Sequence, residues 1–126
     1  MLFSVLIPVY NISRYLPECV KSALSQSEQD FELVLVDDGS TDGSGQMCDN
    51  FAAQHPDQIR VIHQANSGLI LARRAGIAAA KGDYCIFLDG DDALEPDCLA
   101  FVHETIERHN ADIVIYNNYS FFEEDQ

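Results

Sequence analysis

Short apolar runs alternate along the chain with segments in which apolar residues recur at helical spacing. The apolar runs predict buried strands over residues 3–9, 31–36, 59–63, 84–88 and 113–116. The helical spacing predicts helices over about 13–24, 44–55, 69–81 and 96–110. Strands that alternate with helices predict βαβ units, and therefore an α/β fold with a mostly parallel sheet flanked by helices.

Three residues suggest where these helices begin and end. Ser13 is a candidate N-cap for the first helix, because its hydroxyl can accept a hydrogen bond from an unpaired backbone N–H. Gly82 is a candidate C-terminal stop for the third helix. Pro96 suits the first turn of the fourth helix, where a missing N–H has no consequence.

Polar residues follow three of the predicted strands directly. The three segments are Pro8-Val9-Tyr10-Asn11, Asp37-Asp38-Gly39-Ser40 and Asp89-Gly90-Asp91-Asp92. In an open parallel sheet, ligands bind outside the carboxyl ends of the strands, near the point where the strand order reverses. The sequence therefore predicts one binding site built from these three strand ends.

The segment Asp89-Gly90-Asp91-Asp92 places three carboxylates within four residues. Such groups repel one another unless a cation lies between them, and hard oxygen ligands suit Mg²⁺ or Mn²⁺. Gly90 is expected to let the chain turn so that Asp89 and Asp91 face the same point. An acidic turn in which Asp91 or Asp92 caps the next helix explains the same spacing equally well.

The run from Asp37 to Asp42 also allows two interpretations. One of its carboxylates can accept a hydrogen bond from a base edge, such as a uracil imide N–H, while Asp42 or Ser44 caps the following helix. A plain Asx turn needs the same residue types.

An aromatic residue and a pair of arginines are further candidates. Tyr10 can stack on a nucleobase or pack on the first helix. Arg73 and Arg74 lie in the third predicted helix, and adjacent helical residues point about 100° apart. We therefore expect at most one of them to face a phosphate and the other to be solvated.

Composition narrows the class of partner. The 126 residues fit a single domain, 47% of them are hydrophobic, and 21 acidic against 7 basic residues give a net charge of −14. This charge argues against nucleic acid and against an anionic membrane surface as partners. The four cysteines form no CxxC unit and predict free thiols in a reducing compartment, with Cys85 buried. No signal peptide or transmembrane segment is expected.

Four blocks in order resemble the inverting glycosyltransferases of family 2. They are the stretches from Ser4 to Asn11, from Phe31 to Asp42, from Asn66 to Gly76, and from Gly82 to Asp92. The resemblance implies a Rossmann-like GT-A fold, a nucleoside-diphosphate sugar donor with UDP as the expected nucleotide, and help from Mn²⁺ or Mg²⁺. It also implies that a hydroxyl acceptor, on a glycan or a lipid-linked molecule, receives the sugar with inversion.

The resemblance also implies roles for individual residues. The nucleotide pocket would be lined by the last four residues of the first block, Pro8 to Asn11, with Asp38 reading the base and Asp37 beside it. Gly68 and Arg73 would lie near the donor. Asp91 would be the main metal ligand, Asp89 would lie nearer the ribose or sugar, and Asp92 would be a further ligand. The residues expected to bind the nucleotide sugar are thus Pro8, Val9, Tyr10, Asn11, Asp37, Asp38, Gly68, Arg73, Asp89, Gly90 and Asp91.

Two departures from the family pattern affect these expectations. Arg74 stands where the family often has Asn, which leaves open which side chain there meets the donor. The general base that an inverting transferase needs is expected beyond Gln126. Residues 1–126 are therefore expected to be one donor-binding domain, the N-terminal portion of a longer enzyme that is cytoplasmic or peripheral at the inner face of the membrane.

Two other functions fit parts of the sequence. A phosphatase of the haloacid dehalogenase type would use Asp89 as nucleophile and Asp91 as acid, but no Lys follows Asp92. A non-catalytic nucleotide-binding module would need no base. Whatever its activity, a short sheet can expose an unpaired edge, so self-association is expected.

Overall fold

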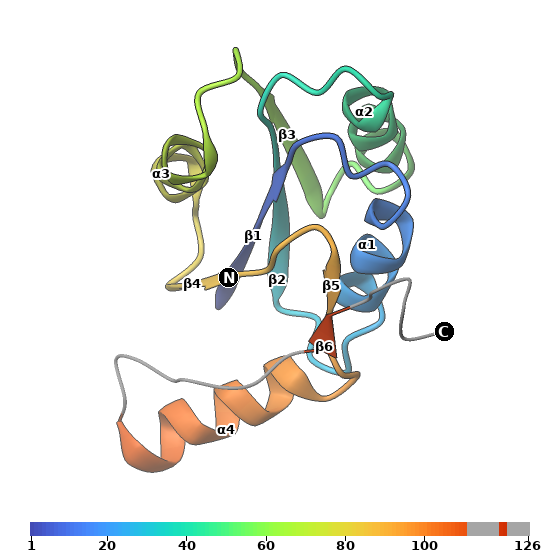
Figure 1. Ribbon diagram of the computed structural model, residues 1–126. Helices are drawn as coiled ribbons and strands as arrows, with labels where there is room; N and C mark the ends of the chain where they lie inside the picture. Colours follow the sequence, from blue (N-terminus) through green and yellow to red (C-terminus); the bar gives the residue numbers. More distant parts are fainter. Residues whose placement is uncertain (111–118, 121–126) are drawn as a thin grey trace.

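The computed structural model describes residues 1–110 and 119–120, and its centre is a parallel sheet of four strands in the order β3-β2-β1-β4 (Figure 1). The strands are β1 (Phe3–Val9), β2 (Phe31–Asp37), β3 (Ile59–His63) and β4 (Tyr84–Phe87). The helices are α1 (Leu16–Leu24), α2 (Ser44–Gln54), α3 (Leu69–Ala79) and α4 (Cys98–His109). A second, antiparallel pair joins β5 (Asp92–Ala93) to β6 (Tyr119–Ser120).

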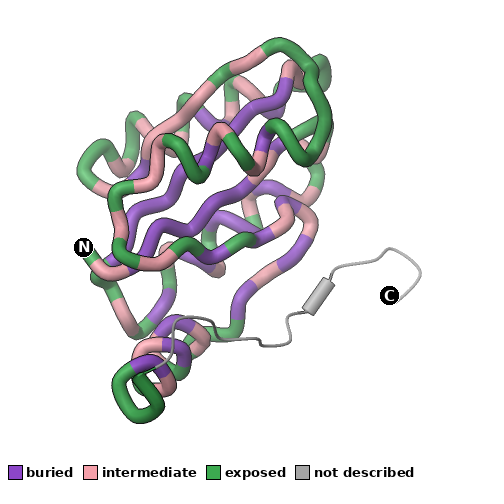
Figure 2. Tube along the Cα trace, turned by 90° about the vertical axis from the view of Figure 1, so that its left-hand side faces the viewer, coloured by how far each residue is buried: buried purple, intermediate pink, exposed green. Residues whose placement is uncertain are grey.

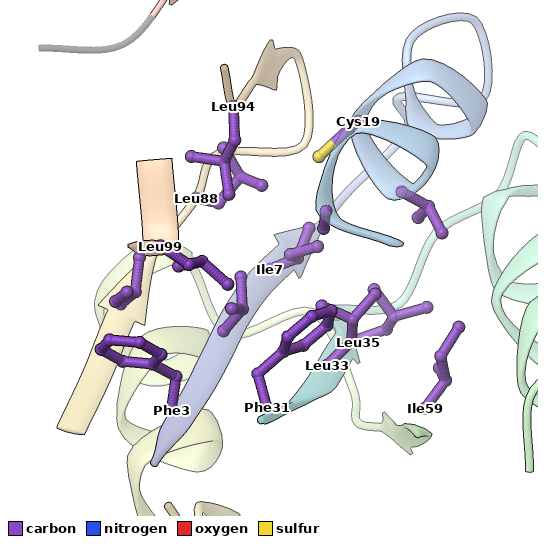
Figure 3. Close-up of a cluster of buried hydrophobic side chains, with 14 of the residues drawn as sticks. Phe3, Ile7, Cys19, Phe31, Leu33, Leu35, Ile59, Leu88, Leu94 and Leu99 are labelled. Carbon is purple, nitrogen blue, oxygen red and sulfur yellow. The ribbon is translucent and has the colours of Figure 1, made fainter. Parts of the chain in front are cut away.

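Helices cover both faces of the sheet. Figure 1 shows α1 and α2 on one side and α3 on the other. Alternate residues of β1 face opposite layers. Ile7 belongs to the larger core, which includes Cys19 of α1 (Figure 3). Leu6 packs with Ala72 of α3 in the other layer. The expected α/β fold with a parallel, helix-flanked sheet is thus confirmed. In Figure 2 the central strands form the buried interior between the two helix layers.

The strand order reverses beside β1. The chain goes from β1 outward through β2 to β3, and then β4 pairs with the opposite edge of β1. Because all four strands are parallel, their carboxyl ends lie along one rim. The gap at this rim, between β1 and β4, is the point where an open α/β sheet is expected to bind a ligand.

The helix boundaries differ from the sequence-based expectations at three places. Helix α1 begins at Leu16 with Tyr15 as its N-cap, so Ser13 is not the N-cap. The Ser13 backbone N–H donates to the Asp42 carboxylate 3.1 Å away. Pro96 lies just outside α4, whose N-cap is Asp97. Helix α3 already ends at Ala79, with Ala80 as its C-cap, so Gly82 does not stop it.

The glycine at position 82 is explained by its close contact with β1. A Cβ atom at this position would lie 2.6 Å from the Phe3 carbonyl carbon, and the Gly82 N–H donates to the Ser4 hydroxyl at 2.8 Å. The same hydroxyl donates to the buried Glu32 carboxylate, which also accepts from the Lys81 backbone N–H at 2.7 Å. The glycine is needed because the chain between α3 and β4 runs directly against β1.

Two further expectations concern single segments. Cys85 was expected to be buried, but it is exposed. Among the described residues β4 lies at the edge of the sheet, and alternate side chains of a strand point to opposite faces. The strand predicted over residues 113–116 and the acidic end of the chain after Ser120 lie outside the described residues. Within the described ranges, no helix is both long and apolar enough to cross a bilayer.

Candidate functional site

A cleft of about 470 Å³ opens at the carboxyl rim of the sheet. Its walls come from the ends of β1 and β2, from the start of α3 and from the loop after β4. It is lined by Pro8, Val9, Tyr10, Ile12, Asp38, Asn66, Gly68, Leu69, Ala72, Asp89, Gly90 and Asp91. Four segments that are far apart in the sequence therefore meet at the rim where the strand order reverses.

One end of the cleft is acidic. Asp89, Asp91 and Asp92 each offer a carboxylate oxygen, and these atoms all lie within 4.8 Å of one another. The Asp92 backbone N–H donates to the Asp89 carbonyl at 3.0 Å, so a tight turn holds the three side chains together. This is the spacing that a small divalent cation with oxygen ligands requires. Asp92 is buried and starts β5, a strand that the sequence did not predict.

Gly90 lies in this turn as expected, but the structure gives the glycine a different role from conformational freedom. Its backbone is not in the left-handed region, so conformational freedom does not explain the glycine. A Cβ atom at position 90 would instead lie 1.8 Å from Cδ1 of Ile12. Glycine therefore lets the acidic turn pack directly on the segment that follows β1.

Arg73 is the arginine that faces the site. Its Nη2 donates to Oδ1 of Asp89 at 3.2 Å, and its guanidinium lies over the ring of Phe87, 5.8 Å from the centroid. Its Nε is buried and has no hydrogen-bond partner among the residues that the structure describes. Arg74 is exposed, as the angular separation of adjacent helical residues requires.

The Asp38 carboxylate is engaged by the loop between β3 and α3. Its oxygens accept hydrogen bonds from the backbone N–H groups of Ser67 (2.8 Å) and Gly68 (2.9 Å) and from the side-chain amides of Gln64 (2.9 Å) and Asn66 (3.3 Å). Burial alone would raise the pKa of Asp38, but the hydrogen bonds from Gln64, Ser67 and Gly68 outweigh it and lower the pKa. Asp38 therefore holds the loop between β3 and α3 in place as a wall of the cleft. The residues next to Asp38 in the sequence do not predict this structural role.

Asp37 lies behind this wall rather than in the cleft. Its carboxylate accepts from the Ser40 N–H at 3.0 Å and lies 2.8 Å from Nδ1 of His63, whose Nε2 lies 2.8 Å from Asp49. Burial would raise the pKa of Asp37, but the hydrogen bonds from Ser40 and His63 lower it overall. The two carboxylates raise the pKa of His63, Asp49 contributing more than Asp37.

Asn11 joins two loops and is not among the residues that line the cleft. Its backbone is left-handed, with φ 51°, and its side-chain oxygen accepts from the Thr41 N–H at 2.7 Å. Asp42 completes this connection, because it accepts from Ser13 and from both the N–H and the hydroxyl of Ser44 at the start of α2. The N-cap of α2 is Gly43, without a side-chain cap hydrogen bond, so neither Asp42 nor Ser44 is the expected N-cap. Hydrogen bonds from Ser44 lower the pKa of Asp42.

The cleft thus brings together most of the predicted residues and several that were not predicted. Eight of the expected positions line it: Pro8, Val9, Tyr10, Asp38, Gly68, Asp89, Gly90 and Asp91. Tyr10 is 48% exposed at the mouth of the cleft and is therefore not buried against the first helix. Ile12, Asn66, Leu69 and Ala72 also line it. For Asn66 the turn Asn66-Ser67-Gly68 was a usable signal, whereas the other three are apolar residues whose pattern indicates only packing.

Comparison with known proteins gives a consistent result. The family model described as glycosyl transferase family 2 matches residues 4–126. Glycosyltransferase GlyG of Streptococcus pneumoniae serotype 4 is 42% identical over 125 residues, which cover 98% of this chain and 41% of GlyG. The chain therefore spans less than half the length of this relative.

Solved structures show the same fold. S. aureus TarS in complex with UDP-GlcNAc superposes with a TM-score of 0.82 at 31% identity, over 89% of this chain and 33% of TarS. The mannosyltransferase PcManGT from Pyrobaculum calidifontis, in complex with GDP-Man and Mn²⁺, gives 0.77 at 25% identity, over 82% of this chain and 32% of that one. These matches confirm the expected GT-A fold, and the chain belongs to glycosyl transferase family 2.

Proposed function

We propose that this chain binds a nucleoside-diphosphate sugar and forms the donor site of an enzyme that transfers the sugar to a hydroxyl acceptor with inversion. The observation that carries the proposal is the cleft at the point where the strand order reverses, with clustered carboxylates at one end. The TarS complex with UDP-GlcNAc supports UDP as the nucleotide. The family assignment favours this reaction over the phosphatase of the haloacid dehalogenase type.

The nucleotide is proposed to lie along the cleft with its base near Tyr10 and Asp38. Tyr10 is half exposed at the mouth and offers a ring on which a base can stack. An ionised carboxylate has about four lone-pair positions, and Asp38 already accepts four hydrogen bonds. An imide N–H would therefore replace the longest of them, from Asn66, while Gly68 would let the ligand approach the backbone closely.

A divalent cation, Mn²⁺ or Mg²⁺, fits the other end. Asp91 is the proposed main ligand, with Asp89 and Asp92 as further ligands, because their oxygens meet within 4.8 Å and are all hard donors. The bound ion would neutralise charge that develops on the departing diphosphate. Arg73 is proposed to add a second positive charge near the phosphates, since it already lies beside Asp89.

The remaining parts of the reaction are proposed for a longer enzyme, because the chain spans 41% of the length of GlyG. A carboxylate in a later segment would take the proton of the acceptor hydroxyl, which a glycan or a lipid-linked molecule would supply. A cytoplasmic location, free or at the inner face of the membrane, would give access to the nucleotide sugar. Strand β4 lies at one edge of the four-stranded sheet, and we propose that this edge permits self-association, which a light-scattering mass of a monomer would contradict.

The proposal is tested by calorimetric titration of UDP with and without Mn²⁺. We expect UDP to bind at least about tenfold more tightly with Mn²⁺, and Asp91→Asn to remove this difference, because Mg²⁺-like ions are held jointly by carboxylates and phosphates. Asp57→Asn, which changes an exposed carboxylate in the turn between α2 and β3, is the matched control and should leave both affinities unchanged. Metal-independent UDP binding that also survives Asp91→Asn would show that the metal assignment is wrong.

A further inference from the structure

Phe87 is a large aromatic side chain that remains 42% exposed at the end of an edge strand. It is paired in register with Leu6 of β1, whose side chain packs in the layer that contains Ala72 of α3. In-register residues of parallel strands project to the same face, so the Phe87 ring lies on the side of the sheet that α3 covers. The neighbouring Leu88 belongs to the core on the opposite face.

Helix α3 approaches this face closely because its contact residues are small. A Cβ atom at Gly76 would already lie 3.4 Å from the Leu6 Cβ, and Ala72 and Ala75 pack in the same layer. This close packing brings Arg73, one residue after Ala72, to the edge where β4 ends. The Arg73 side chain therefore reaches both Phe87 and Asp89.

The guanidinium of Arg73 has two distinct contacts there. Its Nη2 donates to Asp89 at 3.2 Å, and its Cζ lies over the Phe87 ring, 5.8 Å from the ring centroid. A guanidinium within about 6 Å of a ring centroid is attracted to the face of that ring. Because its Nε is buried without a hydrogen-bond partner among the described residues, the ring is a principal contact that restrains this part of the side chain.

We propose that Phe87 is a positioning residue of the donor site, whose ring holds the Arg73 guanidinium against Asp89 at the metal end of the cleft. This inference rests on the proposed function of that end. Neither Phe87 nor Arg73 is among the residues that line the cleft, but Arg73 donates to Asp89, which does line it, so Phe87 acts on the site through Arg73. Without an aromatic ring at position 87, the arginine side chain would sample other rotamers, and each productive contact with the diphosphate would require it to be reordered.

The first test observes the contact without any ligand. In ¹H–¹⁵N spectra of the chain, the Nε–H signal of Arg73 should show the displacement that a nearby ring current causes. Phe87→Leu, which keeps an apolar side chain of similar reach, should abolish this displacement, and Phe87→Trp should retain it. An Arg73 signal that Phe87→Leu leaves unchanged would overturn the inference, whatever the chain binds.

The second test measures UDP affinity in the presence of Mn²⁺. Phe87→Leu should weaken binding about two- to fivefold, the range expected for one cation–π contact, and Phe87→Trp should restore it. In an Arg73→Gln background, Phe87→Leu should have no further effect, because the proposed action passes through the arginine. Phe101→Leu, the same change at an aromatic residue of α4 that is 59% exposed, is the matched control.

The outcomes of the second test separate two kinds of failure. If the unaltered chain binds no UDP with Mn²⁺, the proposed function is wrong, while the spectroscopic test still decides whether Phe87 restrains Arg73. If the unaltered chain binds UDP and Phe87→Leu binds it equally well, the positioning role is wrong and the proposed function stands. An equal loss in the Arg73→Gln background would likewise contradict action through Arg73.

Discussion

Two acidic loops flank the end of β1, and their carboxylates differ in what surrounds them. At the end of β2 and in the loop after it, Asp37, Asp38 and Asp42 all accept hydrogen bonds from N–H or O–H groups. The donors belong to the same loop, to the start of α2 and to neighbouring loops. In the loop after β4, Asp89 pairs with Arg73, and three carboxylate oxygens lie within 4.8 Å of one another. Loops of nearly the same composition therefore have different structural consequences: the first is stabilised by the fold, whereas the second concentrates like charges that a cation would stabilise.

The largest effect that this comparison predicts is on stability at Asp38. Asp38→Ala removes the acceptor of two backbone N–H groups and two side-chain amides in the wall of the cleft. Hydrogen bonds to charged groups contribute about 1.5–3 kcal/mol each but are not additive, so we expect a total loss of about 3 kcal/mol. For a chain of this size that corresponds to a fall in Tm of roughly 10 °C without ligand. Asp57→Ala is the control, and an unchanged melting temperature for Asp38→Ala would contradict the structural role.

A smaller loss is expected at Gly90, in the second loop. Gly90→Ala would place a methyl group 1.8 Å from Cδ1 of Ile12, and overpacking of this kind costs about 1–3 kcal/mol. Shortening the neighbour in the double variant Gly90→Ala, Ile12→Ala should recover part of the loss relative to Ile12→Ala alone. Denaturant unfolding of the four proteins measures this coupling, and strictly additive effects would show that the two residues do not meet.

The pH dependence of the folding stability should reflect the contact between His63 and Asp37, next to the first loop. Hydrogen bonds to Asp49 and Asp37 raise the pKa of His63 above its ordinary value of 6.5. A raised pKa in the folded state means that the stabilising contribution is complete below pH 6.5 and is lost as the pH rises through the higher, folded value. The difference in urea midpoint between the parent and His63→Gln should therefore be larger at pH 6 than at pH 9. A constant difference across this range would contradict the ion pair with Asp37 and Asp49.

The smallest expected effect on stability is at Asp91. Asp91→Asn removes one of three clustered charges, and without divalent cations we expect a change within about 0.5 kcal/mol. Mn²⁺ should raise the Tm of the parent, because a ligand that binds the folded state stabilises it, but should have little effect on this variant. A destabilisation of more than about 1 kcal/mol would place Asp91 with the structural carboxylates of the first loop.

The sequence predicted the fold well because each strand is a distinct apolar run. The order of strands and helices, the parallel sheet and the meeting of three polar strand ends all followed from it. The predicted start of α1 was wrong: the helix begins at Leu16 with Tyr15 as its N-cap. Ser13 instead donates its backbone N–H to Asp42, a residue 29 positions away. The exposure of Cys85 was missed because an apolar run does not reveal which strand lies at an edge.

The candidate site was predicted less completely, for reasons of tertiary contact. Asp37, Asp38 and Asn11 were all expected to contact the nucleotide. In the structure their polar atoms contact segments that lie apart in the sequence: Asp37 lies beside His63 of β3, and Asp38 and Asn11 accept hydrogen bonds from other loops. The expected turn at Gly90 is present, but its backbone is not left-handed, and the absence of a side chain there leaves room for Ile12. The metal and donor roles of Asp89, Asp91 and Asp92 remain proposals, which the geometry of the cluster supports.

The most direct test of the central claim is to locate bound Mn²⁺ by the paramagnetic broadening of backbone amide signals in the presence of UDP. Because the chain carries a net charge of −14, the alternative is that Mn²⁺ binds weakly to acidic residues elsewhere on its surface. A metal held by the second acidic loop predicts that the amides of Gly90, Asp91 and Asp92 broaden first, and that Asp91→Asn abolishes this selectivity. Broadening that is spread over acidic residues throughout the surface, or that Asp91→Asn leaves unchanged, would contradict the claim that these carboxylates hold the ion.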